Sequence, residues 1–226
     1  MTSYEEIAKD APTGYSTSSK PQAFFERYLG NDLLELQEDL LLRDEKIKSA
    51  QLLGVTEVLP EGEVFLEAGS VSTAKWRQYN VFQFHIPAIH KLFKAVAEMA
   101  REACDYYEID FDAQQYMVQG WFNVNESGSG LLGWHEHGVE GAPNFHGYYC
   151  VNAEPSETLY SVFNEIKVNV NKNDRAILSE MGHPHTQLEW DWPGKRISIA
   201  YDVVPLADVI ANKHKQEFEQ HWIPLV

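Results

Sequence analysis

The chain has 226 residues, 44% of them hydrophobic and 12% aromatic, which is enough for one domain with a substantial core. Its formal charge of −16 argues against a nucleic-acid partner, whose phosphates would be repelled. Membrane insertion is not expected either, because no apolar run approaches the roughly 18 residues that a spanning helix needs. The expected partner is a small molecule, neutral or cationic.

The N-terminal segment and the cysteines predict the compartment. Residues 1–10 are acidic and polar and lack the basic start and apolar middle of a signal peptide. The only cysteines, Cys104 and Cys150, cannot form a disulfide framework, which fits a reducing compartment. Both observations predict a cytoplasmic protein.

The first half of the chain is expected to be mainly helical. Residues 1–20 show no periodicity and predict a loose arm. Pro21 stands at a favourable first helical position and predicts a helix that Gly30-Asn31-Asp32 ends, with Asp32 capping a second helix to about Leu53. Residues 54–80 are mixed, with a turn at 60–63.

The clearest helix is predicted over residues 87–107. Pro87 stands at its start, and nine apolar residues recur at helical spacing. These residues are Ile89, Leu92, Phe93, Val96, Met99, Ala100, Ala103, Cys104 and Tyr107. We expect this face to pack on a sheet.

After Asp112 the pattern changes to short strands separated by turns. The candidates are 115–124, 146–153, 158–163, 166–170, 175–180, 185–190 and 196–204, and a last helix is expected at about 206–219. Helices first and antiparallel strands later predict an α+β fold, with a jelly-roll, cupin-like core in the C-terminal half and the N-terminal helices packed on it. The expected organisation is a single domain over 1–226: an arm at 1–20, helical support at 21–112, the core that carries the site at 113–205, and a helix and tail at 206–226.

Two histidine clusters fall inside this predicted core. His135 and His137 flank Glu136, so in an extended segment both imidazoles point to one side and can bind one ion. A third ligand is expected from His183 or His185. We prefer His185, because an extended segment follows it while His183 lies at the turn. Neutral imidazole ligands predict that metal affinity falls below about pH 6.5.

An arginine follows the second cluster. Arg196 and Ser198 alternate in phase and point to one side of a strand, with Ala200 and Asp202 behind them. A lone arginine inside a barrel is costly, because a buried charge loses its hydration. A carboxylate ligand held by the guanidinium, with the Ser198 hydroxyl as a further donor, would satisfy it.

These motifs, in this order, resemble the iron(II)/2-oxoglutarate-dependent oxygenases, in their prolyl-hydroxylase-like branch. The resemblance covers roughly residues 116–204. It is carried by Trp121-Phe122-Asn123-Val124-Asn125, Gly128, Gly130, His135-Glu136-His137, Gly147-Tyr148-Tyr149-Cys150-Val151, His185 and Gly194-Lys195-Arg196-Ile197-Ser198.

The resemblance implies a double-stranded β-helix that uses iron(II), 2-oxoglutarate and O2, and hydroxylates an unactivated C–H bond of a small metabolite such as an amino acid. His135, His137 and His185 would then bind iron. Arg196 and Ser198 would bind the distal carboxylate of 2-oxoglutarate, with help from Tyr148 or Tyr149. Gln119 and Asn123 are expected to face inward.

The chain departs from the family at its third ligand, where the usual Asp or Glu is replaced by His137. Three neutral imidazoles leave the iron centre one positive charge higher than two imidazoles and a carboxylate. Glu136 is the alternative third ligand. Two other functions remain open: a three-histidine, cupin-type dioxygenase that does not use 2-oxoglutarate, and a non-catalytic jelly-roll module for metal binding or assembly.

Overall fold

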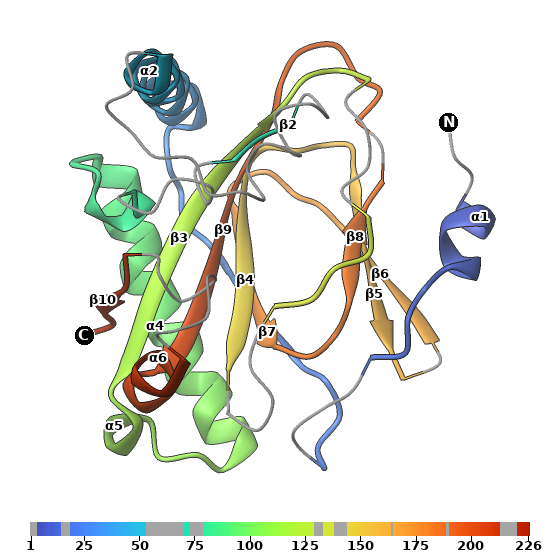
Figure 1. The fold of residues 1–226 in the computed structure, drawn as a ribbon, viewed down its shortest axis with the longest axis vertical. Coiled ribbons are helices and arrows are strands. Elements are labelled where there is room, and N and C mark those ends of the chain that lie inside the picture. Colours follow the sequence, from blue (N-terminus) through green and yellow to red (C-terminus); the bar gives the residue numbers. More distant parts are fainter. Residues whose placement is uncertain are drawn as a thin grey trace.

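The computed structural model describes residues 4–14, 19–52, 70–72, 79–128, 133–137, 144–163, 165–188, 190–212 and 221–226. A larger and a smaller antiparallel sheet pack against each other, and the main helices lie on the far side of the larger sheet (Figure 1). The larger sheet has the order β1-β7-β4-β9-β3-β10, with β2 also paired to β3, and the smaller has the order β6-β5-β8. This arrangement confirms the predicted α+β class with a jelly-roll core.

The strands of the C-terminal half lie close to where the sequence predicts them. They are β3 (Tyr116–Asn125), β4 (Phe145–Asn152), β5 (Glu157–Val162), β6 (Glu165–Val170), β7 (Arg175–Glu180), β8 (His185–Gln187) and β9 (Arg196–Pro205). The short elements β2 (Ser70–Ser72) and β10 (Ile223–Pro224) pair with β3 on its two ends. The core prediction is therefore confirmed at the level of individual strands.

Alternation along the strands separates two environments. On β9, Ile197, Ile199, Tyr201 and Val203 join the hydrophobic core under the helices. The intervening residues Arg196, Ser198, Ala200 and Asp202 face the smaller sheet, together with the residues opposite them on β3 and β4. We call this side the inner face. It includes Gln119 and Asn123, which pair with Asp202 and Ser198, so their inward orientation is confirmed.

The helices cover the outer side of the larger sheet. Helix α4 (Pro87–Tyr107) has the predicted bounds, and its apolar face is buried against the sheet. Helix α2 (Leu33–Leu52) begins as expected after Asp32, whose Oδ1 accepts hydrogen bonds from the backbone N–H groups of Leu34 and Glu35. Within the described ranges, no helix is long and apolar enough to cross a membrane.

The helix predicted from Pro21 is wrong. Phe24–Tyr28 form strand β1, which pairs antiparallel with β7 at the edge of the larger sheet. The segment is too short to gain much from helical periodicity, and its aromatic residues pack better on a sheet edge. The Phe24 ring lies 5.2 Å from the Tyr160 ring, edge to face, and thus joins the two sheets.

The N-terminal segment, expected as a loose arm, contains helix α1 (Tyr4–Lys9). The buried side chain of Ile7 anchors it, and the Ile7 carbonyl accepts a 3.0 Å hydrogen bond from Trp134 Nε1. Farther along, the Ser161 hydroxyl donates to the Pro12 carbonyl. The arm therefore lies against the smaller sheet and the segment around Trp134.

The remaining short elements are the 3-10 helix η2 (Val81–Gln83), α5 (Phe111–Gln114) and α6 (Leu206–Asn212). The predicted last helix is observed only as α6, because residues 213–220 lie outside the described ranges. The turn predicted at 60–63 also lies outside them. The division of the chain at residues 20, 112 and 205 stays a prediction.

Gly147 provides a test of the sheet packing. A Cβ at this position would lie 2.1 Å from the Ile177 carbonyl oxygen and 2.4 Å from the Tyr201 ring, both held in the core. We expect Gly147→Ala to lower the free energy of unfolding by about 3 kcal/mol or more, because the backbone oxygen cannot yield. Urea denaturation followed by tryptophan fluorescence measures this. The control is Gly133→Ala, whose Cβ would meet no atom within 4 Å; equal stabilities of the two variants would contradict the packing.

Candidate metal centre

One isolated backbone bridge brings the two histidine clusters together. The N–H of His135 donates to the carbonyl of His185 at 3.1 Å, and the N–H of His185 donates to the carbonyl of His135 at 2.8 Å. His185 begins β8, whereas His135 lies in an isolated bridge outside the named strands. His137 follows two residues later, so three imidazoles converge from segments about 50 residues apart.

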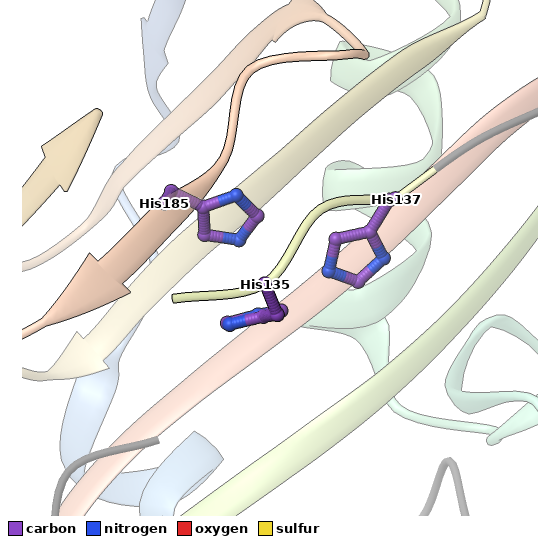
Figure 2. A group of neighbouring side chains, drawn as sticks. All are labelled: His135, His137 and His185. Atoms are coloured by element: carbon purple, nitrogen blue, oxygen red, sulfur yellow. The ribbon is translucent and has the colours of Figure 1, made fainter. Parts of the chain in front are cut away.

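The three rings are spaced as ligands of one ion would be. The ring centroids are 4.4 Å apart for His135 and His185, 5.3 Å for His135 and His137, and 5.2 Å for His137 and His185. Imidazoles that bind one ion through nitrogen at roughly 2.1 Å and at angles of about 90–110° have centroids roughly 4.5–5.3 Å apart. Figure 2 shows the His137 and His185 rings side by side and His135 seen nearly edge-on; the His135 plane is tilted by 63° to His137 and by 55° to His185. The three can supply nitrogen atoms within 4.8 Å of one another.

Hydrogen bonds at Nδ1 select the nitrogen that can bind a metal. Nδ1 of His135 lies 2.9 Å from the Gly133 carbonyl oxygen, and Nδ1 of His185 lies 3.4 Å from the His183 carbonyl oxygen. Nδ1 of His137 lies 3.3 Å from Asp202 Oδ2. These oxygens only accept, so each Nδ1 carries the proton and each Nε2 keeps a free lone pair. Metal-binding histidines are typically held by this kind of contact.

The alternative ligands do not join this group. Among the described residues, two groups of side chains could hold a metal: His135, His137 and His185, and His137, His146 and Asp202. His183 is buried but belongs to neither group, and its ring lies 6.4 Å from that of Phe163. The side chain of Glu136 is exposed and also belongs to neither group. The geometry thus favours His185 over His183 and His137 over Glu136.

Burial keeps His135 and His185 neutral. Loss of hydration, reinforced by repulsion from the neighbouring imidazole of His137, lowers the pKa of His135 to about 3. Burial also lowers the pKa of His185 well below its usual value, with repulsion from the neighbouring imidazoles adding to it. Neutral rings are the form that binds metals. Loss of metal affinity on protonation, expected from the sequence near pH 6.5, therefore moves to lower pH for these two rings.

Arg196 lies on the same inner face and is almost completely buried, with 1% exposure. Its Nη1 donates to Ser198 Oγ at 3.1 Å, and its Nε makes a long 3.4 Å contact with Ser156 Oγ. Nη2 has no hydrogen-bond partner, and no carboxylate pairs with the guanidinium in the part of the chain that the structure describes. A buried cation with an unused donor is a receptor for an anion.

The two candidate tyrosines face opposite sides of β4. Tyr148 is on the inner face, packed with Cys150 and Tyr160, and burial raises the pKa of its hydroxyl, which therefore stays protonated. Tyr149 is on the outer side, where its hydroxyl donates to Asp174 Oδ1 at 2.7 Å and accepts from Asn31. The geometry favours Tyr148, the residue that shares a face with Arg196.

Two inner-face residues contact the site without a predicted role: the sequence analysis did not name His146, and it placed Asp202 on the face of Arg196 but gave it no function. Asp202 Oδ1 lies 2.8 Å from His146 Nδ1, and Oδ2 lies 3.3 Å from His137 Nδ1. Alternation along β9 places Asp202 in phase with Arg196, and the same alternation along β4 places His146 in phase with Tyr148. The alternation of inward and outward residues could therefore be predicted from the sequence. The pairing of β4 with β9, which brings His146 and Asp202 together, could not.

No protein-family model and no curated protein matches the sequence, whereas solved structures do match the fold. A prolyl-4-hydroxylase from Pseudomonas putida has a TM-score of 0.52 at 10% identity, over 83% of this chain and 94% of that one. HygX from Streptomyces hygroscopicus, solved with nickel and 2-oxoglutarate bound, has a TM-score of 0.51 at 9% identity, over 82% and 83%. The chain spans only 59% of a 2OG-Fe(II) oxygenase family oxidoreductase from Burkholderia pseudomallei, which covers 54% of this chain (TM-score 0.42, 13% identity).

The chain has the double-stranded β-helix fold. Its structural neighbours are iron(II)/2-oxoglutarate oxygenases, the group that the sequence resembles. In this double-stranded β-helix, the three imidazoles and Arg196 all lie between the two sheets or at their rim. The fold thus explains why residues from β8, β9 and the segment 133–137 meet.

The lowered histidine pKa values predict how stability depends on pH. Burial lowers the pKa of His146 to about 4, so between about pH 4 and 6.5 the unfolded chain binds a proton that the folded chain does not. The contribution of neutral His146 to the free energy of unfolding is therefore fully present above about pH 6.5 and decreases as the pH falls. Between about pH 7.5 and pH 5 this decrease is about 2 kcal/mol. Urea unfolding of the metal-free protein measures the change. As a control, His90→Gln, at an exposed site on α4, should lose as much stability between the two pH values as the parent protein does. If the parent protein were equally stable at both pH values, the imidazoles would not be buried in neutral form.

Proposed function

We propose that this protein is a non-haem iron(II)/2-oxoglutarate-dependent oxygenase that hydroxylates an unactivated C–H bond of a small metabolite. The observation that carries the proposal is that one core holds both three imidazoles with free Nε2 atoms and a buried guanidinium whose Nη2 has no hydrogen-bond partner. In the overall reaction, one atom of O2 enters the new C–OH group and the other enters succinate, while 2-oxoglutarate loses CO2.

The donor set fits iron(II). His135, His137 and His185 would provide three neutral nitrogen ligands on one side of the ion, and an octahedral ion would keep three positions for the co-substrate and O2. Bound there, iron(II) would supply the O2-dependent oxidation. The Nδ1 contacts of the three imidazoles hold the rings before the metal arrives, which reduces the ordering that binding requires.

The surroundings of Arg196 fit a dicarboxylic acid. Its guanidinium would form charge-assisted hydrogen bonds with the distal carboxylate, and Ser198 would add a hydroxyl to the same site. Tyr148, kept protonated by burial, would be a further donor. Between Arg196 and Asp202 the inward-facing residues of β9 are only Ser198 and Ala200, whose side chains are small.

The proposed substrate is a small neutral or cationic molecule, such as an amino acid. The net charge of −16 supports this class, because a surface of that sign attracts cations and repels polyanions. The exposed side chain of Glu136 adds a negative charge directly beside the proposed metal ligands.

A cupin-type dioxygenase that does not use 2-oxoglutarate is the second candidate, because its metal is also held by three histidines. Such an enzyme has no need for a buried guanidinium with an unused nitrogen, so Arg196 favours the first proposal. A closed zinc site is less well supported: such sites commonly use cysteine. Cys104 contacts the Tyr116 hydroxyl and Cys150 packs among apolar residues, and neither belongs to a metal-ligating group among the described residues.

Arg196→Leu tests the co-substrate assignment. Truncating one partner of a buried charge pair costs about 2–5 kcal/mol, so we expect the Kd of 2-oxoglutarate for the Mn(II)-loaded protein to rise by roughly 30-fold or more. Isothermal titration calorimetry measures the Kd. The control is Arg101→Leu, which removes an exposed ion pair with Asp112 and should leave the Kd unchanged. Unchanged binding to Arg196→Leu would remove Arg196 from the co-substrate site.

His135→Ala tests the metal assignment. We expect loss of Mn(II) affinity well beyond the roughly 10–100-fold that removal of an outer contact causes, and no turnover of 2-oxoglutarate to succinate. The circular dichroism spectrum should be unchanged, because the bridge to His185 uses backbone atoms. His90→Ala is the matched control. Retained metal binding in His135→Ala would exclude His135 from the site.

A further inference from the structure

Asp202 holds a carboxylate between two imidazoles in the interior of the fold. Its exposure is 7%, and each oxygen has its own partner: Oδ1 accepts from His146 Nδ1 at 2.8 Å and Oδ2 from His137 Nδ1 at 3.3 Å. Among the described residues its only ion-pairing partners are these two histidines, with no lysine or arginine. Both oxygens thus accept a hydrogen bond from an imidazole N–H, an arrangement that suits an ionised carboxylate, which is acceptor-only.

These three residues are close enough to hold an ion of their own, but the orientation of the rings argues against it. The His137 and His146 ring centroids are 4.0 Å apart and the ring planes differ by only 16°. At that separation the rings must lie over each other, because coplanar imidazoles would clash. Their lone pairs lie in the ring planes and therefore run side by side instead of meeting at one point. The contacts of Asp202 with these two imidazoles are therefore hydrogen bonds that fix the orientation of the rings.

We propose that Asp202 is a positioning residue that directs Nε2 of His137 toward the metal and supplies the site's negative charge through that imidazole. This inference rests on the proposed function, since it assigns a role around the same metal. It also accounts for the unusual third ligand. In the proposed site, the neutral imidazole of His137 takes the position that a carboxylate ligand has in the related oxygenases. The carboxylate of Asp202, on β9, does not bind the metal itself but contacts it through His137.

The charge of Asp202 would affect the metal through His137. Three neutral imidazoles do not reduce the charge of a divalent ion, whereas a carboxylate hydrogen-bonded to Nδ1–H makes the imidazole a stronger donor at Nε2. Asp202 thus offsets part of the ion's charge without occupying a coordination position. It also fixes the His137 tautomer, which would otherwise interconvert.

His146 stabilises the carboxylate in this orientation. It makes the shorter of the two hydrogen bonds, and its ring stacks on His137. Because His146 occupies Oδ1, Asp202 cannot turn away from His137 without leaving a buried N–H without an acceptor, which costs about 1–3 kcal/mol. Trp121 packs on the His137 ring at 5.5 Å and limits its rotation further.

The first test needs no metal. Two-bond 1H–15N correlation spectra of the metal-free protein, labelled with 15N-histidine, report which nitrogen of each imidazole carries the proton. We expect His137 and His146 to be Nδ1–H tautomers in the parent protein. In Asp202→Asn both should shift toward tautomer mixtures, while His135 and His185 keep their signals because they bond to backbone carbonyls. An Nε2–H tautomer at His137 in the parent protein overturns the proposal, whether or not the variant folds.

The second test measures metal affinity. Asp202→Asn should bind Mn(II) roughly 10–100-fold more weakly than the parent protein, the loss expected for an outer carboxylate, and Asp112→Asn should bind it normally. Wild-type affinity in Asp202→Asn overturns the proposal. The two proposals fail separately: if Mn(II) binds and the tautomers respond to Asp202→Asn but 2-oxoglutarate does not bind, the oxygenase assignment fails and the role of Asp202 stands.

Discussion

The reciprocal hydrogen bonds between the backbones of His135 and His185 are the constraint on which the candidate site depends. They connect the segment 133–137 to the rim of the smaller sheet, where no regular strand holds it. Because the bridge uses main-chain atoms, both side chains remain available for a metal. His137 then needs only the two-residue repeat of an extended chain to reach the same point. Two backbone hydrogen bonds thus determine the positions of three imidazoles.

Two unusual charges lie on the inner face, and each has a specific environment. Arg196 is buried with Nη1 and Nε directed at two serines and with Nη2 unused, whereas Asp202 is buried with both oxygens occupied by imidazoles. They are six residues apart on β9 and do not pair with each other. Burial of each charge costs free energy that a direct ion pair would recover. Keeping them apart leaves an unpaired cation at one end of β9, and at the other end a carboxylate that contacts His137, one of the proposed metal ligands.

The sequence predicted the strands and the inner residues well, because alternation is a local property that survives folding. This period placed Arg196 and Ser198 on one face, and spacing proposed His135, His137 and His185. Alternation alone did not choose between Tyr148 and Tyr149. The strand β1 was missed, because its identity depends on the exposed edge of β7, which local periodicity does not reveal. His146 and Asp202 were missed as partners for a similar reason: a register between β4 and β9 brings them together across 56 residues.

The contact between α1 and the segment before His135 has a consequence for how this protein is handled. Trp134 precedes His135 directly, and its indole donates to the carbonyl of Ile7, whose own side chain is buried. Helix α1 therefore helps to hold the segment around Trp134, which carries two of the proposed metal ligands. Removing the Ile7 contact would free the indole of the residue next to His135, so a variant without α1 should order this segment less well.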